Sequence, residues 1–287
     1  MSALLARIGL YGRMIRFSHT VFALPFALAS AVLAAGGGIS WRQVAWILVA
    51  MVAARSAAMG FNRLADQALD ARNPRTAGRE LPRGAIARSE VWVFVAASAA
   101  TLVVASAMLN PLCLALSPVA LAVVIGYSYT KRFTALSHLF LGLALAMAPV
   151  GAWLAIRGRF EATPVVLGLA VLFWVAGFDI IYACQDEAFD RAEGLHSLPA
   201  RFGAARALGL ARLFHVIAVA LLAAVGALAA LHPVYFAGVA AVAGLLVYEH
   251  SLVRADDLSR VDAAFFTVNG WISLGYFVVT LAARLLA

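Results

Sequence analysis

Charged residues are scarce in this sequence. Asp, Glu, Lys and Arg make up 13% of the 287 residues, whereas hydrophobic residues make up 64% before the 22 glycines are counted. In soluble domains the apolar share is roughly 45–50%, glycine included. A soluble globular protein is therefore excluded, and we expect an integral membrane protein.

Cysteine and lysine are nearly absent. The two cysteines, Cys113 and Cys184, are expected near opposite membrane faces, too far apart to form a disulfide. As isolated residues they do not make a metal site either. Lys131 is the one lysine in the chain. Because lysine is a compact point charge on a flexible stem, its isolation suggests a specific role in binding phosphate.

Long stretches without charge set the architecture. A helix needs about 20 mostly apolar residues to cross a bilayer. Two of the stretches are long enough for two helices each, and the breaks at Asn110-Pro111 and His232-Pro233 predict two helical hairpins. Nine transmembrane helices are expected, at residues 17–36, 43–61, 90–109, 112–129, 137–156, 164–184, 210–230, 234–250 and 264–284.

The basic residues indicate the orientation, because Lys and Arg are enriched in cytoplasmic loops. They are concentrated in the N-terminal segment and in the loops that follow every second helix. Those in the opposite loops are Arg42, Arg157, Arg159 and Arg284. The N-terminus is therefore expected in the cytoplasm. The net charge of +8 reflects this topology and contact with an anionic leaflet, and it needs no nucleic-acid partner.

Two long loops, 62–89 and 185–209, lie on the expected cytoplasmic side, and long loops often carry active sites. At the start of the first loop, Asn62, Asp66 and Asp70 are spaced four residues apart. On a helix this spacing places all three side chains on one face. We therefore expect an acidic motif at the end of the second transmembrane helix.

The second long loop repeats this spacing with Tyr182, Asp186 and Asp190. The two Asp-x-x-x-Asp pairs are 120 residues apart, and each follows a helix that runs inward. Solvated helix ends are the alternative interpretation. Because both spacing and placement match, we favour two half-sites that face each other.

Four converging carboxylates would repel one another unless cations neutralised them. Oxygen ligands suit Mg²⁺, which commonly bridges protein carboxylates to substrate phosphates. Basic residues on the same side can hold the remaining phosphate charge: Arg63, Arg72, Arg75, Arg79, Arg83, Lys131, Arg132 and Arg191. A site of this kind in a membrane fits a lipid-linked diphosphate, whose departure the cations would stabilise.

Arg55 and Asp179 lie inside expected transmembrane helices, where an ionised group is costly and usually functional. Each stands seven residues before an acidic motif, so both are expected to point toward the site. A buried structural pair is the alternative interpretation.

No catalytic histidine is assigned. His19, His138 and His250 lie near expected helix ends and are interpreted as interfacial residues, whereas His215 has no carboxylate or histidine at ligand spacing. His196 is interpreted as an ordinary residue of the second long loop.

Three stretches carry a family resemblance: NRLADQALD at 62–70, with Arg75-Thr76 and Leu81-Pro82 following, then Tyr127 to Thr134, which includes KRFT at 131–134, and DIIYACQD at 179–186, followed by Asp190. Together they resemble the UbiA family of intramembrane aromatic prenyltransferases. The resemblance covers nearly the whole chain. It implies one domain over 1–287, an all-α protein with nine transmembrane helices around a central cavity and two Asp-rich cytoplasmic loops.

The resemblance also implies roles for individual residues. Asp66, Asp70, Asp186 and Asp190 match the metal-binding motifs. The diphosphate is assigned to Asn62, Lys131, Arg63, Arg72 and Arg75, although many members have aspartate where this chain has Arg63. The acceptor is assigned to Arg55, Asp179 and Tyr182, and the Asp179 carboxylate is expected to orient the acceptor or to remove its proton.

The family uses Mg²⁺ to join a polyprenyl diphosphate to an aromatic acceptor in quinone synthesis. Stretches 15–20 and 194–203 resemble a bacterial inner-membrane group generally described as 4-hydroxybenzoate polyprenyltransferases, which act in ubiquinone synthesis. Similar members prenylate a dihydroxynaphthoate-type acid in the futalosine route to menaquinone. We expect 4-hydroxybenzoate as the acceptor and keep the naphthoate as the alternative.

Two other classes of membrane protein compete with this interpretation. A secondary transporter would use Arg55 and Asp179 near the midplane and serve both faces, but the charges here gather on one side. A phosphatidyltransferase that acts on a CDP-activated lipid needs its aspartates in a single run, and here they are split between two loops.

Overall fold

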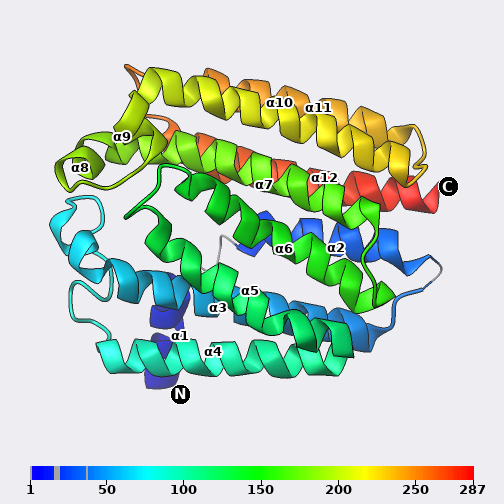
Figure 1. The fold of residues 1–287 in the computed structure, drawn as a ribbon, viewed down its shortest axis with the longest axis horizontal. Helices are drawn as coiled ribbons and strands as arrows, with labels where there is room; N and C mark the ends of the chain where they lie inside the picture. Colours follow the sequence, from blue (N-terminus) through cyan, green and yellow to red (C-terminus); the bar gives the residue numbers. More distant parts are fainter. Residues whose placement is uncertain (1, 16–19, 37) are drawn as a thin grey trace. The chain divides into compact units, whose positions relative to one another are not determined.

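The protein is described by a computed structural model that covers residues 2–15, 20–36 and 38–287. Within these ranges the secondary structure is helical and no strand forms (Figure 1). The elements are α1 (Ser2–Met14), α2 (Thr20–Ala35), α3 (Trp41–Arg72), α4 (Arg88–Leu109), α5 (Pro111–Thr130), α6 (Ser137–Arg157), α7 (Ala162–Ala183), η2 (Cys184–Asp186), α8 (Glu187–Ala192), α9 (Leu198–Phe202), α10 (Ala204–Leu228), α11 (Val234–Ser251), η3 (Ala263–Val268) and α12 (Asn269–Leu285).

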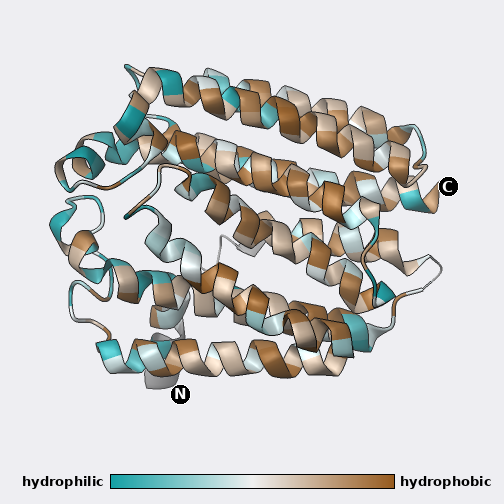
Figure 2. Ribbon diagram, in the orientation of Figure 1, coloured by the Kyte–Doolittle hydropathy of each residue, from teal (hydrophilic) through white to brown (hydrophobic). Residues whose placement is uncertain are grey.

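Eight helical segments in the described part of the chain are long and apolar enough to cross a membrane. They coincide with the last eight of the nine expected helices, and Figure 2 shows apolar residues along them and polar residues in the loops around α8 and α9. The expected first helix overlaps α2, whose apolar stretch Phe22–Ala35 is shorter than the other eight. Residues 16–19, which include His19 and the start of that expected helix, lie outside the described residues. The all-α membrane fold is thereby confirmed.

Two helices differ from the sequence-based boundaries. Helix α3 continues to Arg72 instead of ending near residue 61. Residues 62–72 contain neither glycine nor proline, so nothing interrupts the helix before Pro74 disfavours helical geometry at Asn73. Residues 2–14 lie outside the nine expected transmembrane helices, yet they form helix α1. Its burial against neighbouring helices explains why it forms although it is not a long apolar run.

The chain divides into two compact units, of which the first comprises residues 1–20 and 45–129. Here α1 packs on α3 and α4 through a buried apolar cluster that includes Met14, Leu64 and Val91. The rings of Tyr11 and Phe94 stack at 5.2 Å between centroids. This packing fixes the stretch of α3 that carries the first acidic motif.

The second unit comprises residues 21–44 and 130–287. Helix α7 packs along both α6 and α10, and α11 packs against α10 and α12. Aromatic rings bind α2 to this core, because Phe26 lies 4.9 Å from Trp174 and 4.7 Å from Tyr276 between ring centroids. Helix α7 is therefore the central helix of this unit, and its C-terminal end leads into the second acidic motif.

A buried polar network joins four elements of the second unit. Trp174 Nε1 donates to Asn269 Oδ1 at 2.7 Å, and Asn269 Nδ2 donates to Glu249 Oε1 at 2.8 Å. The same amide nitrogen also donates to the carbonyls of Ala264 and Phe265 in the π-helix η3. Glu249 is fully buried. Because an unpaired buried polar group is costly, this set of partners specifies how α7, α11 and α12 meet.

Two histidines join this network, which corrects their sequence-based interpretation. His215 Nδ1 lies 3.0 Å from His250 Nε2 and 3.8 Å from Glu249 Oε2. Histidine and carboxylate partners therefore do surround His215, and His250 near the end of α11 is one of them. Both partners come from α11, so no spacing within α10 could reveal them.

Glycine allows α6 and α7 to approach closely. A Cβ atom at Gly142 in α6 would overlap the carbonyl oxygen of Leu172 in α7. Small residues at such contacts are typical of packed membrane helices. Gly151, also in α6, has open space where its Cβ would be.

We expect Gly142→Ala to lower the free energy of unfolding by about 1–3 kcal/mol, because the added methyl group forces the backbones apart. Gly151→Ala is the matched control and should be neutral or stabilising by up to about 1 kcal/mol, since alanine is the better helix former. Thermal unfolding of both variants in detergent measures the difference. Equal melting temperatures for the two variants would refute the close contact.

Candidate active site

The first acidic motif lies on one uninterrupted α-helix, as its spacing predicts. Asn62, Asp66 and Asp70 all belong to α3. Asp66 and Asp70 are only 3% and 5% exposed. Asn62 Nδ2 donates to Asp66 Oδ2 at 3.3 Å, which orients that carboxylate. Two acidic side chains are therefore buried one helical turn apart in the first unit.

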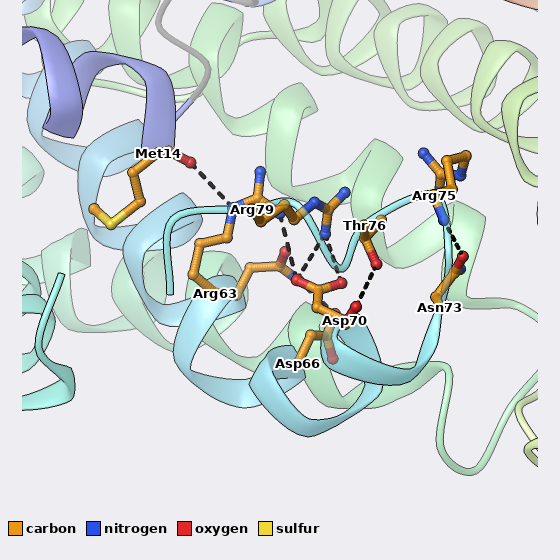
Figure 3. A network of polar contacts seen from close by, with 9 residues as sticks. Met14, Arg63, Asp66, Asp70, Asn73, Arg75, Thr76 and Arg79 are labelled. Carbon is orange, nitrogen blue, oxygen red and sulfur yellow. Dashed lines mark hydrogen bonds and ion pairs between the residues drawn. The ribbon is translucent and has the colours of Figure 1, made fainter. Parts of the chain in front are cut away.

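Arginine side chains surround Asp70 (Figure 3). Arg79 Nη1 donates to both carboxylate oxygens, at 2.7 and 2.8 Å, and Arg63 Nη1 lies 3.9 Å from Oδ2. Arg63 also donates from Nε to the carbonyl of Met14 at 3.0 Å. A buried carboxylate needs such partners to offset its loss of hydration. In this structure Arg63 and Arg79 therefore contact Asp70, and the assignment of Arg63 to the diphosphate stays a prediction.

Hydrogen bonds of Thr76 and Asn73 stabilise the turn after α3. Thr76 Oγ1 donates to the Asp70 carbonyl at 3.0 Å, and Asn73 Oδ1 accepts from the backbone nitrogen of Arg75 at 2.9 Å. The last carbonyls of a helix need partners of this kind. Arg72 and Arg75 are exposed, and Figure 3 shows Arg75 away from the carboxylates. Both side chains are thus accessible to a ligand from outside the helix.

Tyr127 is a residue of this site that the sequence assignment omitted. It lies in α5, within electrostatic range of Asp66, Arg55 and Arg63. Arg55 is partly buried on α3, as expected for a charged residue inside a transmembrane helix. The available signal was the position of Tyr127 four residues before Lys131 in the sequence.

The second acidic motif differs from the first in its backbone. Helix α7 ends at Ala183, the 3₁₀ turn η2 contains Asp186, and α8 contains Asp190. A 3₁₀ helix turns by about 120° per residue instead of about 100°, so each of its residues rotates the following side chains by about 20°. The second motif therefore does not lie on one uninterrupted α-helix, as the first does.

The loop after α8 brings Lys131 close to Asp190. Ser197, Lys131 and Asp186 all lie within electrostatic range of the Asp190 carboxylate. His196 donates from its backbone nitrogen to the Lys131 carbonyl at 2.7 Å. A cation and two carboxylates therefore meet at one end of the second unit, as a site for a metal-bound phosphate requires.

Asp179 has a buried histidine as its partner. His138 Nδ1 lies 2.7 Å from Asp179 Oδ2, and His138 is 3% exposed. The interpretation of His138 as interfacial is therefore wrong, because α7 and α9 cover it. One helical turn beyond Asp179, Tyr182 packs on Phe265 at 4.3 Å between ring centroids.

The residues present fit Mg²⁺. No three His, Cys, Asp or Glu side chains in the described ranges are close enough to make a complete protein metal site. Mg²⁺ usually takes only one or two carboxylates and completes its shell with water and substrate phosphate. Asp66 with Asp70, and Asp186 with Asp190, are pairs of this kind.

Comparisons with known proteins agree with the motifs. The model of the UbiA prenyltransferase family matches residues 23–272. A 4-hydroxybenzoate octaprenyltransferase from Cupriavidus necator is 33% identical over 287 residues, which are 98% of this chain and 99% of the relative. The enzyme of the same name from Aromatoleum aromaticum is 30% identical over 280 residues, 96% of this chain and 95% of the relative.

Solved structures share the fold. The apo structure of a UbiA homolog from Aeropyrum pernix has a TM-score of 0.80 and 32% identity, covering 93% of this chain and 97% of that one. A UbiA homolog from Archaeoglobus fulgidus bound to DMAPP and Mg²⁺ has a TM-score of 0.69 at 20% identity, covering 95% of this chain and 99% of that one. The chain thus belongs to the UbiA prenyltransferase family.

Proposed function

We propose that the protein transfers a polyprenyl group from a polyprenyl diphosphate to 4-hydroxybenzoate, in an Mg²⁺-dependent reaction of ubiquinone synthesis. The observation that carries this proposal is the similarity, over almost the full length, to relatives named 4-hydroxybenzoate octaprenyltransferase. The single domain expected over 1–287 is part of the same proposal. The two acidic motifs and the nearby cations supply the chemistry that the reaction needs.

The diphosphate is proposed to bind at both acidic motifs. Asp66, Asp70, Asp186 and Asp190 would hold Mg²⁺, which supplies positive charge to the departing diphosphate when it is bound. Lys131 would bind a phosphate oxygen directly. Further contacts to the diphosphate are assigned to Asn62, Arg63, Arg72 and Arg75.

The acceptor is proposed to contact Arg55, Asp179 and Tyr182. Arg55 would pair with the carboxylate of the acceptor. The ring carbon ortho to the hydroxyl bonds to the allylic carbon, and the electron pair of the broken C–O bond leaves with the diphosphate. The ring carbon then loses its proton to Asp179, and the C–H electron pair restores the aromatic ring.

A dihydroxynaphthoate-type acid is the alternative acceptor, because it too combines an aromatic carboxylate with a hydroxyl. We also propose a bacterial inner-membrane location with the N-terminus and the active site on the cytoplasmic side. The distribution of Lys and Arg over the loops supports this orientation.

Asp66→Asn should reduce Mg²⁺-dependent transfer by about 100-fold, since it removes a metal-binding charge while keeping the size of the side chain. Asp256→Asn is the matched control, because Asp256 is 80% exposed and forms its ion pair at the surface. Product formation in membranes across a range of Mg²⁺ concentrations measures both variants. Full activity of Asp66→Asn would show that this motif is not the metal site.

Lys131→Gln should raise the KM for polyprenyl diphosphate by about 10- to 100-fold, the range expected for a lost charged hydrogen bond. Arg132→Gln, which removes the adjacent charge, should change this KM less. The assignment of Lys131 fails if the two variants behave alike.

The acceptor is tested by incubating membranes that contain the protein with Mg²⁺, a long-chain polyprenyl diphosphate and either 4-hydroxybenzoate or 1,4-dihydroxy-6-naphthoate. Mass spectrometry should detect prenylated benzoate. Product from the naphthoate alone would replace the proposed acceptor with the alternative.

A further inference from the structure

The segment 196–198 contacts several candidate site residues of the second unit at once. The backbone nitrogen of His196 donates to the Lys131 carbonyl at 2.7 Å. Next along the chain, Ser197 lies close to the Asp190 carboxylate. The backbone nitrogen of Leu198 then donates to His138 Nε2 at 3.3 Å. Through His138, the segment that follows the second acidic motif is therefore connected to Asp179.

The partners of His138 determine where its ring proton lies. A backbone N–H can only donate, so Nε2 must accept from Leu198 and carries no proton. The neutral ring then carries its proton on Nδ1, and the partner of Nδ1 is Asp179 Oδ2 at 2.7 Å. We assign His138 as the donor and the carboxylate as the acceptor of this short hydrogen bond.

The carboxylate of Asp179 is held on one side and open on the other. Its side chain is 24% exposed, whereas that of His138 is 4% exposed. In the described part of the chain, this carboxylate forms one hydrogen bond, and it is made by Oδ2. A buried donor behind one oxygen fixes the plane of the group and leaves the other oxygen for a ligand.

We propose that His138 is a positioning residue that holds the Asp179 carboxylate so that Oδ1 meets the aromatic acceptor. This inference rests on the proposed function, in which Asp179 receives the ring proton. The proton passes from the ring carbon to Oδ1, while His138 keeps its own proton on Nδ1. His138 thus acts through Asp179 and touches neither the acceptor nor the diphosphate.

The test compares two substitutions at one position. His138→Leu removes both the donor and the acceptor and should lower kcat about 10- to 100-fold with little change in the KM for polyprenyl diphosphate. His138→Gln offers one N–H donor and one carbonyl acceptor at the end of a side chain of similar reach. It should restore kcat to within a few-fold of the wild type.

Two further variants separate positioning from stability. Ser30→Ala removes a buried hydrogen bond from Ser30 Oγ to the carbonyl of Pro149. Pro149 lies in α6, the helix that also contains His138. It should leave kcat unchanged even if the protein becomes less stable. In a double-mutant cycle, His138→Leu should have little further effect on kcat in an Asp179→Asn background, because the two residues act as one unit.

Each outcome bears on a separate claim. A full kcat in His138→Leu, an equal loss in His138→Gln, or additive losses in the cycle would overturn the positioning role. A wild-type protein that prenylates neither acceptor would instead overturn the proposed function, and the role of His138 with it.

Discussion

A backbone that crosses lipid must satisfy its hydrogen bonds within itself, and this constraint governs the whole chain. It makes the spanning segments helical and leaves polar chemistry to helix ends and to the few places where buried partners are complete. Helix α3 shows the consequence most directly. Its apolar part crosses, and its continuation beyond Phe61 carries buried Asp66 and Asp70 on the same rigid helix.

Buried polar groups in this protein occur in sets rather than as single pairs. Asp70 contacts two arginines and, through its carbonyl, a threonine. Asn269 contacts Trp174, Glu249 and the carbonyls freed by the π-helix η3. A set with most of its members paired tolerates only one arrangement of its helices, because any shift leaves a buried group without a partner. Such sets therefore specify helix contacts that apolar packing alone leaves adjustable.

The sequence predicted what depends on neighbours along one helix. The positions of the apolar helices and the shared face of Asn62, Asp66 and Asp70 follow from spacing alone. Contacts between helices do not, because they join residues far apart in the chain: His138 and Asp179 are 41 positions apart, and His215 and His250 are 35 apart. The 3₁₀ turn at Asp186 was missed for another reason, since a local tightening of the helix leaves no mark on residue spacing.

The short segment 196–198 also bears on how the second unit moves. Its two backbone donors are bonded to two different parts of the unit, at Lys131 and His138. Displacing the segment breaks both bonds together, so the loop opens as one cooperative unit of local unfolding rather than by fraying residue by residue. Amide hydrogen exchange at His196 and at Leu198 is then governed by the same opening event.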